Sequence, residues 1–389
     1  MAAGVGTLLI VLFFATVSIN YVRHCEGVYF LKLAGFKFEL TDDVMLGEED
    51  KVVWGISWKS VLGALSPKRA YAYGEPRLKL EWFESDGSGY VRNIYPDGRE
   101  LLTCFSRYYD SLGKVPMGLF VGGGLPYHTH GDGEVTANDT GMAYYDGHRW
   151  YHLWCNVNEG ISPASTSANM LTPSQWEFLG SKVVEANPKR VVLKSSHRVP
   201  LDGTTMQIDR YAVFKAGEPY FVLLNRVWNV GATAGAYIYT YGDEPWVGNF
   251  GTSGGNIGWQ KDRLFNYEGE IDPRKTSFAG MYDLGNRSIG EQGDFTRKAN
   301  FIEWLAEPPD LAYFSNDFGR FARESDRAPL NSKNNRVISL QWGAKNLQPN
   351  QSALYVLAIG MADTTSASEL PVKPKIDISY QEVQDILIN

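Results

Sequence analysis

Alternation of apolar and polar residues is the main pattern in this chain. It recurs between residues 77 and 362 in runs rich in β-branched and aromatic residues, bounded by Gly, Pro, Asn and Asp, which is typical of strands. The runs span residues 77–83, 90–94, 100–104, 191–197, 205–215, 220–230, 236–241, 336–347 and 353–362. Two turns, at 95–98 and 146–147, predict hairpins. Because long helices do not alternate with these strands, the sequence predicts a mainly β protein, a large antiparallel sandwich with few short helices.

One segment has a helical pattern instead. Thr172 and Gln175 have the spacing of a capping box, and Pro173 occupies the first helical position. Apolar residues then recur at helical spacing at Trp176, Leu179 and Val183. The sequence therefore predicts a helix that starts after Thr172.

The stretch between residues 242 and 332 has no clear periodicity. It is rich in Gly, Asn, Asp and aromatic residues. A structureless stretch of this length is uncommon in a compact domain. We therefore expect either a functional loop region or strands that periodicity does not reveal.

The first apolar stretch runs from Gly4 to Val22 and contains no charged residue. As a helix it is roughly 28 Å long, close to the hydrocarbon thickness of a bilayer. We expect it to anchor the chain in a lipid bilayer, with a cleaved signal peptide and a buried core helix as alternatives. Arg23 favours a cytoplasmic body, but large domains translocate largely regardless of charge.

The predicted organisation follows from this anchor. Residues 1–24 form the anchor, residues 25–370 an extracytoplasmic β-sandwich, and residues 371–389 a docking tail. If the body has two sub-domains, their boundary lies near residues 165–190. The body is expected to be periplasmic or extracellular, because it is rich in aromatic residues and Gly and Asn turns and poor in cysteine.

Charge and cysteine content narrow the classes of partner. The net charge of -7 and pI near 5.5 exclude nucleic acid, because no basic stripe is present to neutralise phosphates. With the body outside the cytoplasm, Cys104 and Cys155 form the plausible disulfide, leaving Cys25 free or acylated. Three separate thiols are the alternative.

A group of histidines suggests a metal site. His128, His130 and His152, with Glu134, could bring imidazoles and a carboxylate to one divalent metal if paired strands carry them. The alternative is a Gly-rich loop whose histidines form local hydrogen bonds. No cofactor is predicted otherwise.

The spacing around these histidines has its own resemblance. Gly122-x5-His128-x-His130-x3-Glu134-x6-Gly141 resembles the first metal-binding motif of cupins. The second cupin motif is absent.

The stretch from 241 to 259 is the second candidate site. It places acidic and aromatic side chains among glycines, an arrangement on which sugar rings or partner chains stack. The predicted ligand or partner surface consists of Asp243, Glu244, Trp246, Phe250 and Trp259. Glycoside chemistry would need two facing carboxylates, which adjacent Asp243 and Glu244 do not provide. The alternative is a structural loop whose aromatic residues fill the end of the sandwich.

A short segment carries a second resemblance. The run RYAVFKAGEPYFVLLNRVWNVG, from Arg210 to Gly231, resembles the paired central strands of the galactose mutarotase-like supersandwich. That resemblance implies a large two-sheet sandwich and a carbohydrate partner. It identifies no catalytic residue.

These observations lead to one main function hypothesis and two alternatives. The main hypothesis is a single-pass, membrane-anchored accessory or scaffolding subunit, whose partners are other subunits of a membrane complex. The first alternative is a carbohydrate-binding or carbohydrate-active sandwich, and the second a metal-dependent enzyme at the histidine cluster. Catalytic residues remain unassigned, because the chain has no P-loop, Gly-x-Ser-x-Gly or CxxC motif.

Overall fold

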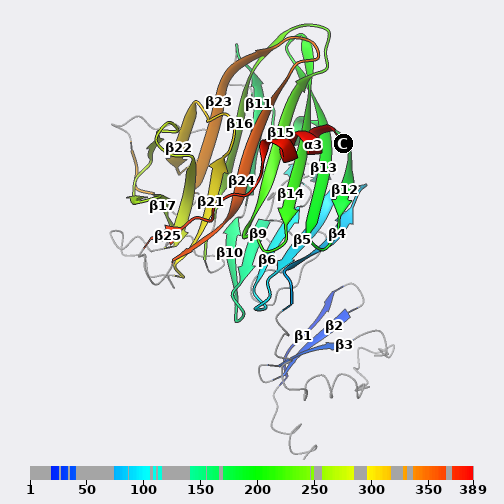
Figure 1. Ribbon diagram of the computed structural model, residues 1–389, viewed down its shortest axis with the longest axis vertical. Helices are drawn as coiled ribbons and strands as arrows, with labels where there is room; N and C mark the ends of the chain where they lie inside the picture. Colours follow the sequence, from blue (N-terminus) through cyan, green and yellow to red (C-terminus); the bar gives the residue numbers. More distant parts are fainter. Residues whose placement is uncertain are drawn as a thin grey trace, which may run out of the picture. The chain divides into compact units, whose positions relative to one another are not determined.

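The computed structural model divides the chain into two compact units, residues 1–72 and 73–389. The backbone is described for residues 19–25, 28–33, 36–40, 74–85, 87–105, 108–110, 113–115, 141–154, 156–165, 170–245, 247–248, 256–283, 296–316, 327–330, 336–364 and 370–388. In the first unit these residues form a three-stranded antiparallel sheet (Figure 1). Its strands are β1 (Ile19–Cys25), β2 (Val28–Leu33) and β3 (Phe36–Leu40).

The last residues of the predicted membrane helix form a strand in the structure. Residues 4–18 lie outside the described residues, but Ile19 to Val22 belong to β1, which pairs with β2. Ile19, Tyr21 and Val22 have side chains that favour extended backbone, and polar Asn20 interrupts the apolar run. Among the described residues, no helix has the length and apolar character needed to cross a membrane.

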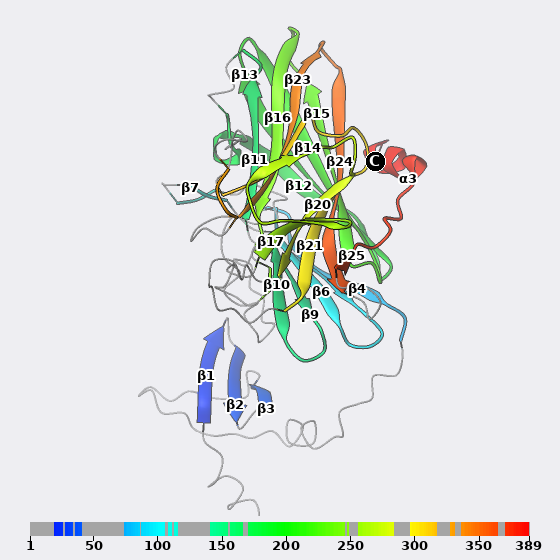
Figure 2. The same ribbon diagram turned by 90° about the vertical axis from the view of Figure 1, so that its left-hand side faces the viewer.

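The second unit is built from a ten-stranded sheet and two five-stranded sheets (Figures 1 and 2). The ten-stranded sheet has the order β12 (Glu177–Ala186), β13 (Arg190–Leu201), β14 (Thr204–Lys215), β15 (Tyr220–Asn229), β24 (Ser352–Thr364), β21 (Lys298–Trp304), β20 (Phe278–Asp283), β17 (Asn256–Gln260) and β18 (Arg263–Phe265), with β25 (Pro371–Val372) beside β24. One five-stranded sheet has the order β10 (Trp150–Trp154), β9 (Gly141–Tyr145), β6 (Glu100–Phe105), β5 (Ser88–Ile94) and β4 (Arg77–Phe83). The other has the order β11 (Asn156–Pro163), β16 (Gly235–Glu244), β23 (Val337–Leu347), β22 (Leu311–Ser315) and β19 (Gly269–Ile271). The strands β7 (Tyr108–Asp110) and β8 (Gly113–Val115) form a separate hairpin.

Two layers of core lie on opposite faces of the ten-stranded sheet. The inner face packs against both five-stranded sheets in one apolar cluster. Phe105 of β6 makes edge-on contacts with Phe214 of β14 and Phe221 of β15, at ring-centroid distances of 6.1 and 5.9 Å. Such aromatic pairs each contribute about 0.5–1.5 kcal/mol beyond their burial. They therefore help to hold the two sheets together.

The outer face carries the second apolar cluster, which the end of the chain covers. Helix α3 (Tyr380–Ile388) buries Val383 and Ile386 against it. The Lys215 ammonium lies 2.9 Å from a Glu382 carboxylate oxygen, and the Asp377 main-chain N–H donates to the Tyr220 hydroxyl at 2.7 Å. Figure 1 shows α3 in front of β13, β14 and β15, and in Figure 2 it stands on the side of β24 away from β11 and β16.

The predicted mainly β fold is confirmed, with large antiparallel sheets and one short α-helix among the described residues. The strand predicted at 77–83 has the bounds of β4. The two predicted turns are also present, with Gly98 and Gly147 at φ values of 83° and 100°. Those positive values explain why glycine occupies both positions.

The helix predicted after Thr172 is wrong. Only the turn η1 (Pro173–Gln175) forms, in which the Thr172 main-chain N–H donates to Gln175 Oε1 at 3.0 Å. The chain then continues as β12, which pairs with β13. The capping residues therefore form their hydrogen bond, but only over a single turn. Pairing of β12 with β13 determines the conformation of the residues that follow, although their apolar spacing is helical.

The region without periodicity contains strands. Between residues 242 and 332 the structure has β17, β18, β19, β20, β21 and β22. All six residues of β20 are buried, so both of its faces are covered and its sequence does not alternate.

Candidate ligand-binding groove

Polar side chains gather on the outer face of β12, β13 and β14, two residues along the strands from the apolar rows that α3 covers. Val192 lies under the second core, whereas Lys194 and Ser196 follow it on the same face of β13. On β14 the same face carries Asp209, opposite Ser196, and Gln207, opposite Arg198. Alternation therefore directs a row of polar residues outward while their neighbours fill the inner core.

Strand register brings these residues into two cross-strand rows. One row pairs Lys182 with Lys194 and Lys194 with Tyr211. The next row contains Gly180, Ser196, Asp209 and Arg226, each opposite its neighbour. Directly opposed residues on one face have Cβ atoms about 4.5–5.5 Å apart, so their side chains interact.

A β-bulge opens the surface beside these rows. The register of β12 on β13 shifts between Phe178 and Gly180, which leaves Leu179 as an extra residue with 38% of its surface exposed. Gly180 has φ 137°, and no atom lies within 4 Å of where its Cβ would be. The missing side chain leaves open space opposite Ser196.

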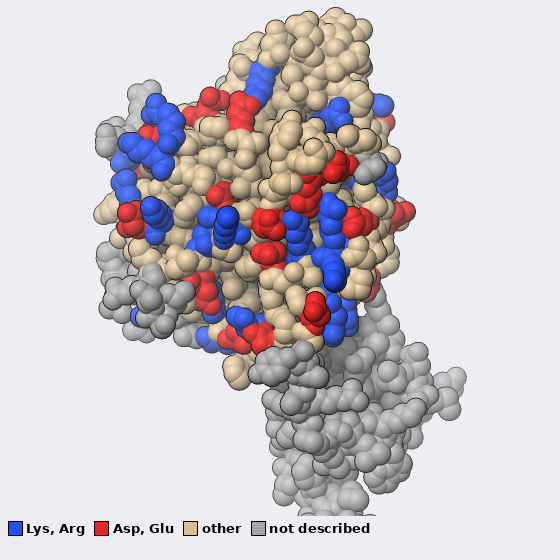
Figure 3. All heavy atoms as spheres, in the orientation of Figure 1, with Lys and Arg blue, Asp and Glu red and all other residues tan. Residues whose placement is uncertain are grey.

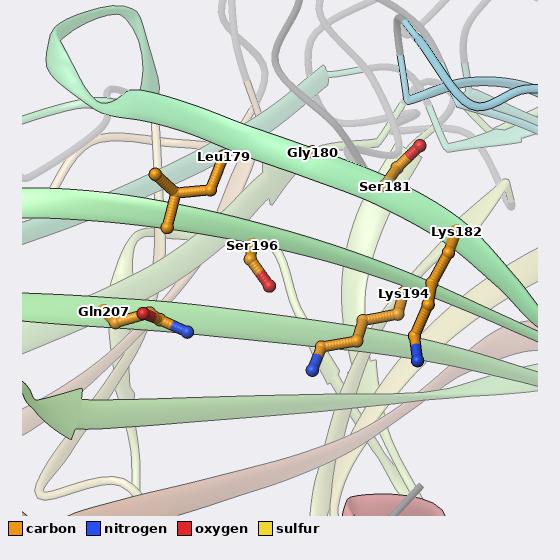
Figure 4. Close-up of a pocket in the computed structure, with 7 residues that line it drawn as sticks. All are labelled: Leu179, Gly180, Ser181, Lys182, Lys194, Ser196 and Gln207. Carbon is orange, nitrogen blue, oxygen red and sulfur yellow. The ribbon is translucent and has the colours of Figure 1, made fainter.

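The result is an open groove of about 390 Å³, within the range of about 300–1,000 Å³ that is usual for small-molecule sites. Figure 4 shows its side chains, and Figure 3 shows the face with α3, on which acidic and basic residues are intermingled. The groove is lined by Leu179, Gly180, Ser181, Lys182, Lys194, Ser196 and Gln207.

Asp209 is the centre of the hydrogen bonds beneath this groove. The Ser196 hydroxyl donates to Asp209 Oδ1 at 2.6 Å, and Gln207 Nε2 donates to the same oxygen at 2.9 Å. Lys194 Nζ lies 3.8 Å from Asp209 Oδ2. With only 2% of its surface exposed, Asp209 holds the groove side chains in place and leaves their outer atoms accessible.

Aromatic rings support two of the cations on this face. Lys194 Nζ lies 4.9 Å from the centroid of the Tyr211 ring, and Arg226 Cζ lies 4.7 Å from that of Trp228. Cation–π contacts of this kind hold a charged group over an apolar face. The outer face thus combines hydroxyl, amide and ammonium donors, one carboxylate and aromatic surface.

A second polar cluster occupies the inner face of the same strands. Arg210 Nη2 and Nε lie 2.7 and 3.1 Å from the two carboxylate oxygens of Glu159 on β11. Arg210 Nη1 also donates to His197 Nδ1 at 3.0 Å. Because a guanidinium only donates, His197 Nδ1 accepts this hydrogen bond without a proton of its own.

Tyr239 completes the inner cluster from β16. Its hydroxyl donates to Glu159 Oε1 at 2.5 Å and accepts from Asn225 Nδ2 at 2.9 Å. Burial, reinforced by the adjacent Glu159 carboxylate, raises the pKa of Tyr239 well above its usual value. Tyr239 therefore stays protonated and keeps donating, and the cluster ties the two sheets together without access to solvent.

The residues predicted as a ligand or partner surface do not all lie in the described part. Trp259 belongs to the second core, with 1% of its surface exposed and its indole N–H donating to the Asn300 carbonyl oxygen at 3.2 Å. Asp243 and Glu244 end β16, opposite Val157 and Asn156. The side chains of Asp243 and Glu244, and the whole of Trp246 and Phe250, lie outside the described residues.

The predicted metal site stays a prediction. His152 is buried on β10, and its main-chain N–H donates to the Gly248 carbonyl oxygen at 2.8 Å. His128, His130 and Glu134 lie outside the described residues. Within the described part, no three His, Cys, Asp or Glu side chains are grouped to hold a metal. The predicted Cys104–Cys155 pairing is also untested, because Cys155 lies outside that part.

Sequence reasoning missed the groove, although part of its signal was present. Lys194, Ser196, Gln207 and Asp209 occupy the outward positions of two strands whose inward positions are mostly apolar. The alternation of these polar residues with apolar ones was the signal that the sequence contained. The pairing of Lys182 with Lys194 depends on the bulge, which the sequence did not reveal.

Known proteins match this chain in a comparison of structures, but not in comparisons of sequence. No protein-family model and no curated protein matches the sequence. A galactose mutarotase-like protein from Clostridium acetobutylicum is 11% identical, with a TM-score of 0.38 over 75% of this chain and 99% of the other. A protein described as a putative aldose 1-epimerase, from Klebsiella pneumoniae, is 11% identical, with a TM-score of 0.37 over 74% and 87%.

A heparan sulfate lyase from Pedobacter heparinus is 10% identical, with a TM-score of 0.35 over 73% of this chain and 36% of the lyase. The resemblance expected from Arg210 to Gly231 thus agrees with the proteins that the structure resembles. At these identities and TM-scores, the likeness assigns no activity and no site residue to this chain.

Proposed function

We propose that this protein binds a carbohydrate in the groove on the outer face of β12, β13 and β14. The observation that carries the proposal is the arrangement around Asp209, where Ser196, Gln207 and Lys194 are held by one buried carboxylate at the base of an open groove. Sugar hydroxyls both donate and accept hydrogen bonds. Fixed hydroxyl, amide and ammonium groups offer them several partners at once.

The shape of the groove supports a ring-shaped ligand. Gly180 leaves open space on one side, and the exposed Leu179 side chain gives an apolar wall next to it. A sugar ring has an apolar face of C–H groups and a polar rim. It can therefore contact Leu179 while its hydroxyls reach Ser196 and Gln207. We propose with it that the second unit is a supersandwich of the galactose mutarotase-like kind.

The proposal is for binding, and includes no reaction. Glycoside hydrolysis commonly needs two carboxylates facing each other across the scissile bond. In the groove, the Asp209 carboxylate accepts hydrogen bonds from Ser196 and Gln207, and the proposal assigns no second carboxylate to face it.

The membrane-anchored accessory role has less support. Its basis is the stretch from Gly4 to Val22, of which residues 4–18 lie outside the described residues and the last four belong to β1. The carbohydrate hypothesis instead rests on described side chains. An extracytoplasmic location for the body stays a prediction.

Isothermal titration calorimetry of the full chain tests the proposal. The titrants are oligosaccharides of known composition, both neutral and acidic. We expect at least one series to bind, and Gln207→Ala to weaken that binding at least tenfold. Gln348→Ala, at an exposed turn between β23 and β24, is the matched control and should bind as the unmodified protein does. Absence of binding across the panel, or equal binding by Gln207→Ala, would overturn the proposal.

A further inference from the structure

The polar surface of the groove continues onto the next strand of the sheet. Gln207 lies on the far side of the groove from Leu179 (Figure 4). On β15, Trp228 stands directly opposite Gln207. Arg226 stands two residues earlier on the same face, opposite Asp209. Both β15 residues are half-buried, whereas the residues between and beside them are buried. The outer face therefore carries polar and aromatic groups beyond the groove itself.

Arg226 is held in place by an aromatic ring, and its donors are not used within the protein. Its Cζ atom lies 4.7 Å from the centroid of the Trp228 ring. Among the residues that the structure describes, no hydrogen bond or ion pair engages this guanidinium. A guanidinium carries five N–H donors in one plane. Because the indole ring holds that plane, the donors are fixed in position and remain available to a ligand.

The second apolar core limits this surface on one side. Leu224, two residues before Arg226 on the same face of β15, belongs to the core that α3 covers. Arg226 is thus the first residue of β15 on this face beyond the covered rows. The surface open to a ligand therefore extends across the strands, from β12 to β15, and not along them towards α3.

The distance across the strands determines the size of the ligand that fits. Ser196, Asp209 and Arg226 occupy one cross-strand row. Neighbouring strands lie about 4.8 Å apart, so about 10 Å separates the backbones of Ser196 and Arg226. One sugar ring in the groove does not span this distance, whereas the next rings of a linear chain do.

We infer that the ligand of this groove is a linear oligosaccharide, of which one sugar lies in the groove and a following sugar contacts Arg226 in a second subsite. This inference rests on the proposed carbohydrate binding and adds the ligand class, a glycan chain and not a single sugar. In the second subsite the Arg226 guanidinium donates hydrogen bonds to the oxygen atoms of the sugar. Trp228 is a positioning residue, because it holds the guanidinium in place.

Titration calorimetry of the full chain with saccharides of different length tests the second subsite. The probes are the mono-, tri- and hexasaccharides of a linear galactan and of a polygalacturonate. We expect the trisaccharide of at least one series to bind at least tenfold more tightly than its monosaccharide. Arg226→Gln should weaken trisaccharide binding about tenfold, the size expected for lost hydrogen bonds to a charged group. It should change monosaccharide binding less than twofold, which also shows that the variant is folded.

The role of Trp228 is tested in the same way. Trp228→Leu removes the ring beneath the guanidinium and should weaken trisaccharide binding while leaving monosaccharide binding within twofold. Trp228→Phe retains an aromatic ring and should weaken trisaccharide binding less than Trp228→Leu does. Equal effects of Trp228→Leu on both lengths would show that this residue does not position Arg226 for a second sugar.

The matched control is Arg263→Gln on β18, at the other end of the strand order of the same sheet. Arg263 Cζ lies 4.5 Å from the centroid of the Phe265 ring, so the variant removes the same charge and the same kind of contact. It should change binding of every probe less than twofold, and a loss equal to that of Arg226→Gln would overturn the second subsite.

The remaining outcomes separate this inference from the proposed function. If monosaccharides and trisaccharides bind equally, or if Arg226→Gln leaves trisaccharide binding unchanged, the second subsite is wrong while carbohydrate binding stands. If none of these probes binds and the wider panel also fails, both are wrong.

Discussion

Two neighbouring residues of β14, Asp209 and Arg210, have opposite charges and lie on opposite faces of the ten-stranded sheet. Asp209 lies on the outer face, where its partners Ser196, Gln207 and Lys194 are only half-buried. Arg210 lies on the inner face, where its side chain and that of its partner Glu159 have no exposed surface. One strand thus contributes a buried carboxylate to a surface groove and a buried guanidinium to a sealed core.

The difference shows that the exposure of a charged group's partners decides whether the group can contribute to ligand binding or only to stability. Removing both charges of the inner pair from water is costly, and only good geometry and further hydrogen bonds offset that cost. Glu159 has both, from Arg210 and Tyr239. On the outer face, Asp209 is equally buried, but the groups that it orients still reach solvent and are available to a ligand.

The largest expected effect comes from breaking the inner pair. Arg210→Met leaves the Glu159 carboxylate buried without its cation, so we expect the free energy of unfolding to fall by about 3–5 kcal/mol. Replacing both residues, with Glu159→Leu added, should recover at least half of that loss, because no charge then remains buried. Urea denaturation followed by circular dichroism measures both variants.

The outcome for the double variant decides how the inner cluster is understood. If it is no more stable than Arg210→Met, the cluster does more than compensate two buried charges. If Arg210→Met itself costs less than 1 kcal/mol, the contrast between the two faces is wrong.

The second prediction concerns the outer face. Asp209→Ala removes the acceptor shared by Ser196 and Gln207 and the anion beside Lys194. We expect a loss of stability of about 1–3 kcal/mol, smaller than for Arg210→Met, because the orphaned donors remain near solvent. Saccharide binding should weaken at least tenfold, because the groove side chains lose their fixed positions.

Ser196→Ala is the milder companion variant. It removes one hydrogen bond to Asp209 and leaves the Gln207 contact in place. We expect a cost of about 1 kcal/mol in urea denaturation and a smaller loss of affinity than for Asp209→Ala. Unchanged affinity in Asp209→Ala would separate this carboxylate from ligand binding.

Sequence alone could predict much of the fold, because alternation identifies strands that have one exposed face. β4 is such a strand, with alternating burial along its seven residues, and its bounds were predicted correctly. The signal fails where both faces are covered, as in β20, and where a bulge shifts the period, as at Leu179 in β12. Spacing at Trp176, Leu179 and Val183 therefore resembled a helix.

The two polar clusters could not be predicted from the sequence, for a different reason. Glu159 and Arg210 are 51 residues apart and belong to different sheets, so only the packing of the sheets brings them together. The groove needs the register of three strands, and a shift of one residue would place Lys194 and Asp209 on the inner face. Packing also decides the position of Trp259. This aromatic residue was expected on a surface, but it fills the second core.

The smallest effect concerns the apolar part of the outer face, where the chain end covers the sheet. Burial, aided by the negative charge of Glu218, raises the pKa of Tyr220 to about 12, although the hydrogen bond from the Asp377 main-chain N–H opposes the shift. The unfolded chain has a tyrosine pKa of about 10. The folded state therefore binds this proton more tightly. The resulting stability is fully present below about pH 10 and is lost as pH rises through about 12.

Tyr220→Phe isolates this contribution from that of the other buried tyrosines. We expect its thermal midpoint to be slightly lower at pH 7, because the Asp377 N–H loses its acceptor, at about 1 kcal/mol. Between about pH 10 and 12 its midpoint should fall less steeply than that of the unmodified protein, because one fewer proton is released on unfolding. Tyr380→Phe, at a tyrosine of α3 with 79% of its surface exposed, is the control and should follow the unmodified protein throughout. If the Tyr220→Phe and unmodified curves have the same slope in this range, the ionisation of Tyr220 does not contribute to the pH dependence of stability. The stability of the outer face at high pH then comes from its apolar contacts alone.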